Sequence, residues 1–227
     1  MGVDLLMVAD YGELLREEVL SLPPLGAFNI HASILPSYRG AAPVVHAILN
    51  GEKETGVTLF RIERGLDSGP LVASAGVEIG TEETAGELEE RLAVLGAELL
   101  GRQLPLLAAG EAASEPQDES HATLAPKISK ADGLIDWGQP ATAVHDRVRA
   151  MNPWPLAYSF LSPAQGKPAR VRVLRSRAVE PEAEARGLPP GTVCGVESDG
   201  FTVSCSCGAL RVLELQRDAL VGGAARA

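Results

Sequence analysis

The sequence predicts an α/β domain with a mostly parallel sheet, followed by a small domain built from short β-strands. Strand-like and helix-like segments alternate over the first half of the 227 residues, which is typical of an α/β layer. The second half carries one helical segment and then short extended runs separated by Gly and Pro, a pattern that favours a small β-barrel or sandwich. The net charge follows the same division, at −13 for residues 1–126 and +3 for residues 127–227.

Apolar periodicity predicts the elements of the first half. Residues 3–9 (VDLLMVA) form an apolar run typical of a buried parallel strand, and residues 12–22 have a helical spacing that ends at Pro23. Thr84 and Glu87 fit a capping box, so we expect a long amphipathic helix over residues 84–110. The other expected elements are strands at 27–30, 56–63 and 71–79 and a helix at 41–50 with Pro43 in its first turn.

A polar stretch, residues 111–127, contains two prolines and no periodicity, which predicts a linker. The chain then divides into one domain at 1–110 and a second at 128–227, which opens with a helix at 140–151. The strands of the second domain are expected at residues 156–161, 169–177, 191–196, 201–207 and 209–216.

Composition and motifs exclude several classes of protein. No apolar run approaches the roughly 18–20 residues of a membrane span, and the first residues lack the basic region of a secretory signal. Three cysteines without a C-x-x-C pair favour a reduced, cytoplasmic protein. Zinc-ligand spacing, a P-loop, G-x-S-x-G and G-x-G-x-x-G are all missing from the sequence. We therefore expect no metal and no membrane contact.

The chain begins abruptly with a strand that has the composition of a central one. A doubly wound sheet normally has earlier strand–helix units before such a strand. The sequence therefore predicts either a reduced variant of the fold or a chain whose N-terminal part is missing.

Asn29 and His31 lie at the end of a predicted strand, and period-2 alternation sends both side chains to the same face. Strand ends border the crevice in which α/β proteins bind ligands. An amide donor beside an imidazole can stabilise an oxyanion and move a proton. The alternative is structural, because polar residues commonly end strands and cap the next segment.

Two loops offer further polar groups. Asp67 lies in a Gly/Pro loop between two strands, where its carboxylate could orient an imidazole or take a proton from an amine; the alternative is a simple turn residue. Residues 40–43 open a helix whose free N–H groups could hold an anion, or could be an ordinary helix start.

One apolar segment and one basic segment could bind larger ligands. The run Ser33, Ile34, Leu35 and Pro36 could form the apolar base of a site for a flat heteroaromatic ring, or it could pack beneath the next helix. Residues 167–177 contain five basic residues and no acid. In a strand, Arg170 and Arg172 share one face while the valines between them share the other, which favours either a phosphate-contacting stripe or a solvated strand face.

As a set, these residues resemble a known family. Residues 29–70, with NIHASILPSYRGAAP and GLDSGP, resemble the 10-formyltetrahydrofolate-dependent formyltransferases, and within them the enzymes that act on methionyl-tRNA. ETGVT at 54–58 and T-A-G-x-L at 84–88 are narrower marks of that group. KISKADGLIDW at 127–137 and VRAMNPWPLAYS at 148–159 are similar to its C-terminal domain.

The resemblance implies a fold and a reaction. The fold is a Rossmann-like formyltransferase sheet, incomplete at its N-terminal side, followed by an OB-like β-barrel that helps to hold the tRNA. The reaction transfers a formyl group from 10-formyltetrahydrofolate to the α-amine of methionyl-tRNA, with no metal. Asn29, His31 and Asp67 match the catalytic residues of the family, and Ser33–Pro36 matches the stretch that lines the folate site.

The sequence also departs from the family pattern and leaves alternatives open. Asp10 stands where the family usually has a small or apolar residue, and Pro70 where it often has an acidic one. A sugar-amine formyltransferase shares both domains in outline, whereas a glycinamide ribonucleotide formyltransferase should lack residues 127–227. A third alternative is a truncated, non-catalytic fragment that retains weak tRNA binding.

Overall fold

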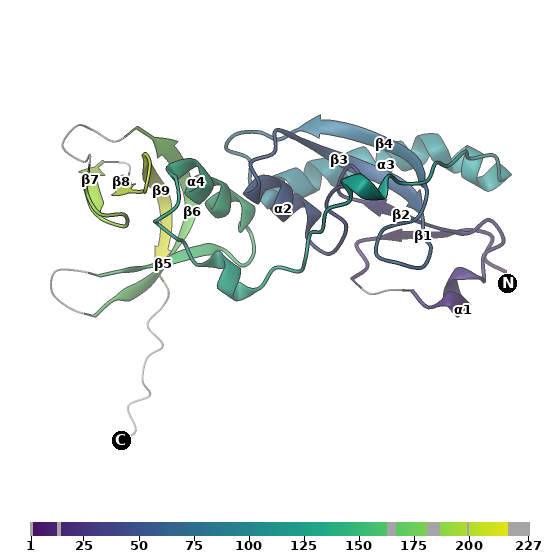
Figure 1. Cartoon of the computed structure of the whole chain (residues 1–227), viewed down its shortest axis with the longest axis horizontal. Coiled ribbons are helices and arrows are strands. Elements are labelled where there is room, and N and C mark those ends of the chain that lie inside the picture. Colours follow the sequence, from purple (N-terminus) through teal and green to yellow (C-terminus); the bar gives the residue numbers. More distant parts are fainter. Residues whose placement is uncertain (1, 13–14, 163–166, 181–186, 199, 218–227) are drawn as a thin grey trace, which may run out of the picture. The chain divides into compact units, whose positions relative to one another are not determined.

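The computed structural model describes residues 2–12, 15–162, 167–180, 187–198 and 200–217. Contacts within the chain divide it into two compact units, Met1–Ile128 and Ser129–Ala227. Each unit has its own sheet (Figure 1). The expected order of an α/β unit followed by a β-rich unit is therefore confirmed.

The sheet of the first unit has four strands in the order β1-β2-β3-β4. These strands are β1 (Leu6–Ala9), β2 (Ala27–His31), β3 (Glu54–Arg61) and β4 (Leu71–Glu78). β1 and β2 are parallel, but β2–β3 and β3–β4 are antiparallel. The expectation of a mostly parallel sheet is wrong for the described strands. Residues 62–70, which join β3 to β4, are too few for a parallel crossover, which needs a dozen residues or more.

Three helices accompany this sheet: α1 (Glu17–Leu20), α2 (Pro43–Leu49) and α3 (Ala85–Ala109). The helix expected over 12–22 is short, and residues 13 and 14 lie outside the described residues. Pro43 opens α2 as expected, where its missing N–H costs no hydrogen bond. The capping box of Thr84 and Glu87 begins α3, and a left-handed Gly110 ends it.

Helix α3 covers the sheet, contacting β3 and β4 (Figure 1). By length and hydropathy alone α3 also qualifies as a candidate membrane span, since it contains a window of mean hydropathy 1.3. The apolar runs of the sequence did not predict this candidate. In this window 22% of the helix is buried, on the side that packs on the first unit. Gly96 permits a close approach, because a Cβ there would lie 3.0 Å from the Ile30 side chain. The other buried residues of α3 are Ala85, Leu88, Leu92, Leu99 and Leu107.

Residues 111–127, which we name the strap, belong to the first unit. The strap contains a short 3-10 helix, η1 (Glu119–His121), and forms isolated β-bridges from Glu115 to Leu71 and from Leu124 to Arg39. The predicted linker is thus bonded along its length to the domain that precedes it.

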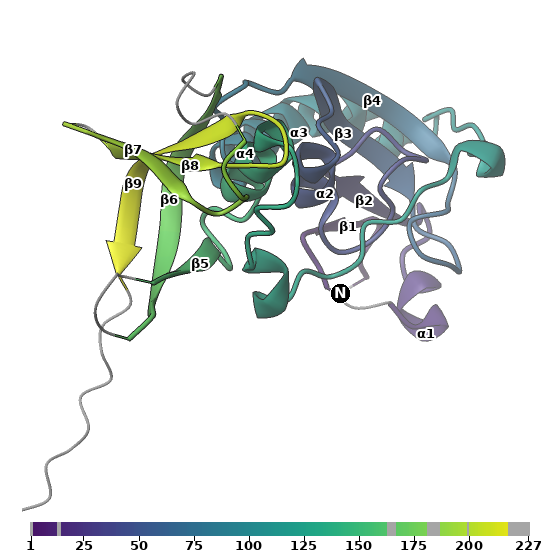
Figure 2. The same cartoon turned by 60° about the vertical axis from the view of Figure 1, so that its left-hand side comes forward.

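The second unit is an antiparallel sheet in the order β5-β6-β9-β8-β7 (Figure 2). A 3-10 turn, η2 (Lys130–Gly133), and helix α4 (Ala141–Ala150) precede the strands. α4 packs on β5, β6 and β9 through a core that includes Val144, Val148, Val173 and Leu210. The strands are β5 (Ala157–Leu161), β6 (Ala169–Val179), β7 (Val193–Glu197), β8 (Gly200–Ser204) and β9 (Ala209–Arg217).

Candidate active site

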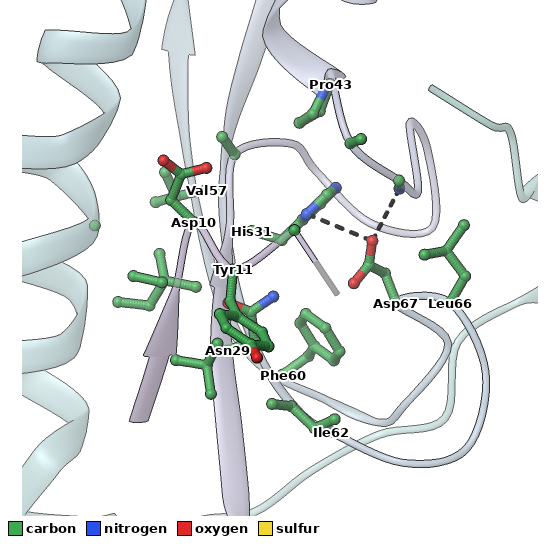
Figure 3. A pocket seen from close by; sticks show the side chains of 18 of the residues that line it. Asp10, Tyr11, Asn29, His31, Pro43, Val57, Phe60, Ile62, Leu66 and Asp67 are labelled. Carbon is green, nitrogen blue, oxygen red and sulfur yellow. Dashed lines mark hydrogen bonds and ion pairs between the residues drawn. The ribbon is translucent and has the colours of Figure 1, made fainter. Parts of the chain in front are cut away.

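A cavity of about 990 Å³ opens in the first unit, at the upper end of the volume typical of ligand pockets. The ends of β1 and β2, the start of α2, the loop before Asp67 and one side of α3 line it (Figure 3). Most lining side chains are apolar. The polar groups that face it include Asn29, His31 and Asp67, so the structure brings the three predicted catalytic residues to one site.

His31 is the last residue of β2, and its side chain is buried. Its Nε2 lies 2.8 Å from the carbonyl oxygen of Tyr38. Because a carbonyl can only accept, Nε2 carries a hydrogen and donates it. Tyr38 has a φ of +62°, an uncommon conformation for a residue other than glycine, and this conformation belongs to the turn that presents the carbonyl to His31. The other ring nitrogen, Nδ1, is therefore the one that can gain a proton.

Asp67 supplies the carboxylate that faces this nitrogen. Its Oδ2 lies 3.7 Å from His31 Nδ1 and accepts a hydrogen bond of 2.8 Å from the backbone N–H of Gly40 (Figure 3). The distance to His31 is that of an ion pair and is longer than a hydrogen bond. Residues 40–43 were expected to offer free N–H groups to an anion. In the structure the N–H of Gly40 binds an anionic group of the chain itself, the Asp67 carboxylate.

Asn29 lies two residues before His31 on β2 and lines the same cavity. Its Oδ1 is buried, and among the described residues it has no hydrogen-bond partner. Buried polar side-chain atoms are satisfied in the large majority of cases. The Asn29 amide is therefore a polar group that a bound molecule would satisfy.

Acidic residues besides Asp67 also line the cavity, among them Asp10 and Glu89. Partial burial, together with the nearby Asp10 carboxylate, raises the pKa of Glu89 on α3 above its ordinary value. Asp10 is one of the two residues, with Pro70, at which the sequence is expected to depart from the family pattern. Its effect on Glu89 was not foreseen, because Asp10 and Glu89 come from elements about eighty residues apart.

The structure does not bring Ser33, Ile34, Leu35 and Pro36 to the described cavity. The Ser33 hydroxyl donates to the carbonyl of Ser37 at 2.6 Å, and the Leu35 N–H donates to Thr58 Oγ1 at 3.1 Å. Leu35 is buried and Ile34 is partly exposed. The segment packs on β3, and its expected role in lining a folate site stays a prediction.

Arg170 and Arg172 lie in the second unit, on β6. Val171 and Val173 are buried at 6% and 1% exposure, while both arginines are partly exposed, so the expected alternation is confirmed. The Arg170 guanidinium lies 3.8 Å from the centre of the Tyr158 ring, within cation–π range. Their proposed contact with nucleic acid stays a prediction.

Comparison with known proteins assigns both units. Residues 1–104 match the family described as formyl transferase, and residues 127–220 match the formyl transferase C-terminal domain. A methionyl-tRNA formyltransferase from Solibacter usitatus is 44% identical over 218 residues, covering 96% of this chain and 67% of that protein. The corresponding protein from Xanthomonas euvesicatoria is 45% identical, covering 96% and 69%.

Solved structures of low identity share the fold. HypX from Aquifex aeolicus, solved with tetrahydrofolic acid, matches with a TM-score of 0.71 at 21% identity, covering 95% of this chain and 36% of that one. The sugar 3N-formyl transferase WlaRD matches with a TM-score of 0.68 at 19% identity, covering 94% and 73%.

Proposed function

Because this chain belongs to the methionyl-tRNA formyltransferase family, we propose that it formylates the α-amine of methionyl-tRNA, with 10-formyltetrahydrofolate as donor. The observation that carries the proposal is that Asn29, whose buried Oδ1 has no partner among the described residues, lines one cavity with the His31–Asp67 pair. We place the reaction in the cytoplasm, where translation begins.

The three side chains can divide the chemistry of formyl transfer. The amine nitrogen bonds to the formyl carbon, whose oxygen takes up negative charge, and the bond from that carbon to N10 then breaks. The Asn29 amide and the protonated ring of His31 are donors for the developing charge. The Asp67 carboxylate favours the protonated imidazole and can accept the amine proton, which finally passes to N10.

The cavity suits a folate-derived donor by size and by lining. Its volume of about 990 Å³ accommodates a ligand of that class, and apolar side chains line most of it. The Asn29 Oδ1, which has no partner among the described residues, can accept a hydrogen bond from the attacking amine, while its Nδ2 is the atom that can donate to the formyl oxygen.

The second unit is the proposed tRNA-holding part. Arg170 and Arg172 display two cations on one strand face, in a half of the chain whose net charge is +3, against −13 for residues 1–126. Contacts of this kind position a nucleic acid without reading its sequence.

A formylation assay tests the proposal. Methionyl-tRNA and 10-formyltetrahydrofolate are incubated with the chain, with the same chain carrying any in-frame upstream codons, and with an Asn29→Ala variant of each. We expect formyl-methionyl-tRNA, formed about 10²- to 10³-fold more slowly by the variant.

Two other outcomes would replace the proposal. Formylation of a nucleotide-linked amino sugar but not of methionyl-tRNA would assign the sugar-amine alternative. Binding of tRNA without turnover by either form would assign the non-catalytic alternative.

A further inference from the structure

The strap reaches the active site through one amide, that of Gln117. Its Oε1 accepts hydrogen bonds from two nitrogens of Arg39, Nε at 3.1 Å and Nη2 at 2.6 Å. Its Nε2 donates to the carbonyl oxygens of Asp67 at 2.8 Å and Gly69 at 2.7 Å. All four hydrogen-bonding positions of the amide are thus used, and they join residue 39 to the loop that carries Asp67.

Arg39 gives this amide a fixed support. Its side chain is buried, and its guanidinium donates to both carboxylate oxygens of Glu119, at 2.8 and 2.9 Å. Its backbone also pairs with the strap, donating to the Thr123 carbonyl and accepting from the Ala125 N–H. Because both the guanidinium and the backbone of Arg39 are hydrogen-bonded, the guanidinium has little freedom to move, and neither has the Gln117 amide that it contacts.

The loop on the other side of Gln117 does not hold its shape by regular pairing. Asp67 has a φ of +47°, a left-handed conformation that an aspartate adopts at a cost. The two hydrogen bonds from Gln117 fall on the carbonyls of Asp67 and Gly69, within this bend. Gln117 therefore restrains the backbone from which the Asp67 carboxylate projects toward His31.

The strap also supports the second partner of His31. Thr123 Oγ1 accepts a hydrogen bond of 2.8 Å from the N–H of Tyr38, whose carbonyl accepts from His31 Nε2. The strap thus contacts the residues on both sides of the imidazole ring.

We propose that Gln117 is a positioning residue of the active site, which sets the distance and direction of the Asp67 carboxylate relative to His31. The inference rests on the proposed function only for its kinetic consequence, because the geometry itself does not depend on the substrate. A merely structural role would lower stability and leave the His31–Asp67 pair unchanged in the folded molecules.

The test is Gln117→Met, which keeps the length of the side chain and removes its donors. We expect kcat to fall about tenfold or more with KM for the folate within about threefold, because a misplaced catalytic group costs rate rather than binding.

Proton NMR of the four histidines gives a readout that needs no substrate. With the His31 signals assigned by their loss in His31→Asn, the chemical shifts of its ring protons at one fixed pH should differ between the wild-type chain and Gln117→Met, because the Asp67 carboxylate faces this ring at 3.7 Å. The other titratable groups that line the cavity are the same in both proteins: Asp10, Tyr11, Glu17, Glu63, Arg64 and Glu89.

Gln103→Met is the matched control, because it makes the same exchange on helix α3, at a residue that does not line the cavity; it should keep kcat within twofold. If Gln117→Met does not fold, Gln117→Asn retains the amide but is one methylene too short to bridge both sides.

A lower melting temperature with an unchanged kcat and unchanged His31 chemical shifts would overturn the proposal. If the wild-type chain does not formylate methionyl-tRNA, the proposed function fails, and the His31 chemical shifts still decide the role of Gln117.

Discussion

The two regions to which the proposed function gives a role are assembled in different ways. In the first unit, contacts link residues 27, 50 and 78 positions apart, from Gly40 to Asp67, from Gln117 to Asp67 and from Gln117 to Arg39. In the second unit, Arg170 and Arg172 stand two positions apart on one strand. Removing one residue of the first region should disturb the whole active site, because its members contact one another. Removing one arginine of the second region should lower tRNA affinity by a limited, separate amount.

The largest expected effect comes from the carboxylate of the first region. Asp67→Asn keeps an oxygen that can accept from the Gly40 N–H, so the fold should persist, but it removes the charge that faces His31. We expect a loss of about 10²- to 10⁴-fold in kcat. Single-turnover formylation measures the rate, and circular dichroism checks the fold. A loss below fivefold would show that Asp67 does not act on His31.

The next effect concerns backbone geometry. Gly40 has a φ of +121°, and a Cβ there would lie 2.7 Å from the Ala125 carbonyl oxygen of the strap. Gly40→Ala should therefore lower the free energy of unfolding by about 1–3 kcal/mol, and activity with it. Gly101 is the matched control, because the space around it is open on helix α3; Gly101→Ala should stabilise by up to about 1 kcal/mol. Equal effects of both changes in urea denaturation would contradict this interpretation.

The second region is expected to respond more gradually. Replacing Arg170 and Arg172 with Ala should weaken binding to different tRNAs by a similar factor and reduce the salt slope by about 1–2. Arg102→Ala, on the exposed side of α3, removes a charge from the other unit and should leave the slope unchanged. Titrations at several salt concentrations measure the slope, and an unchanged slope in the double variant would remove this strand face from the tRNA interface.

The smallest expected effect concerns Asp10. Glu89 has a raised pKa because of its partial burial and the Asp10 carboxylate, so ionised Glu89 disfavours the folded state. This cost is absent below the ordinary pKa of 4.5 and complete above the raised one. Asp10→Asn should therefore stabilise the chain at pH 7 by about half a kcal/mol or less, and not at pH 4. Urea denaturation at both values tests this, with Asp4→Asn as control; a gain that persists at pH 4 would exclude charge as the cause.

The same comparison explains what the sequence could predict. Period-2 alternation predicted the shared face of Asn29 and His31 and the outward arginines of β6, because both depend on neighbours along one strand. The resemblance to formyltransferases predicted Asp67. Gln117 and Tyr38 could not be found in this way, because their roles arise from contacts between segments that only the tertiary fold brings together.

Two further expectations depend on the tertiary fold in a similar way. Alternating helices and strands favoured a parallel sheet, but strand direction depends on how each connection crosses the sheet, and the β3–β4 connection is short. The polar, aperiodic residues 111–127 suggested a linker, yet an aperiodic segment can be bonded to a folded domain as firmly as a strand.

The pairing of the strap with the first unit has a consequence for dissecting the protein into parts. Backbone hydrogen bonds join Glu115 to Leu71, Thr123 to Pro36 and Ala125 to Arg39. A catalytic domain expressed alone and ended at residue 110 would lose those bonds together with the Gln117 amide. Engineers who exchange the second unit should therefore place the junction after Ile128, where the first unit ends. Pro126 should stay with the first unit, because its carbonyl oxygen lies 2.9 Å from His46 Nε2, and Ser129 with the second, because it caps η2.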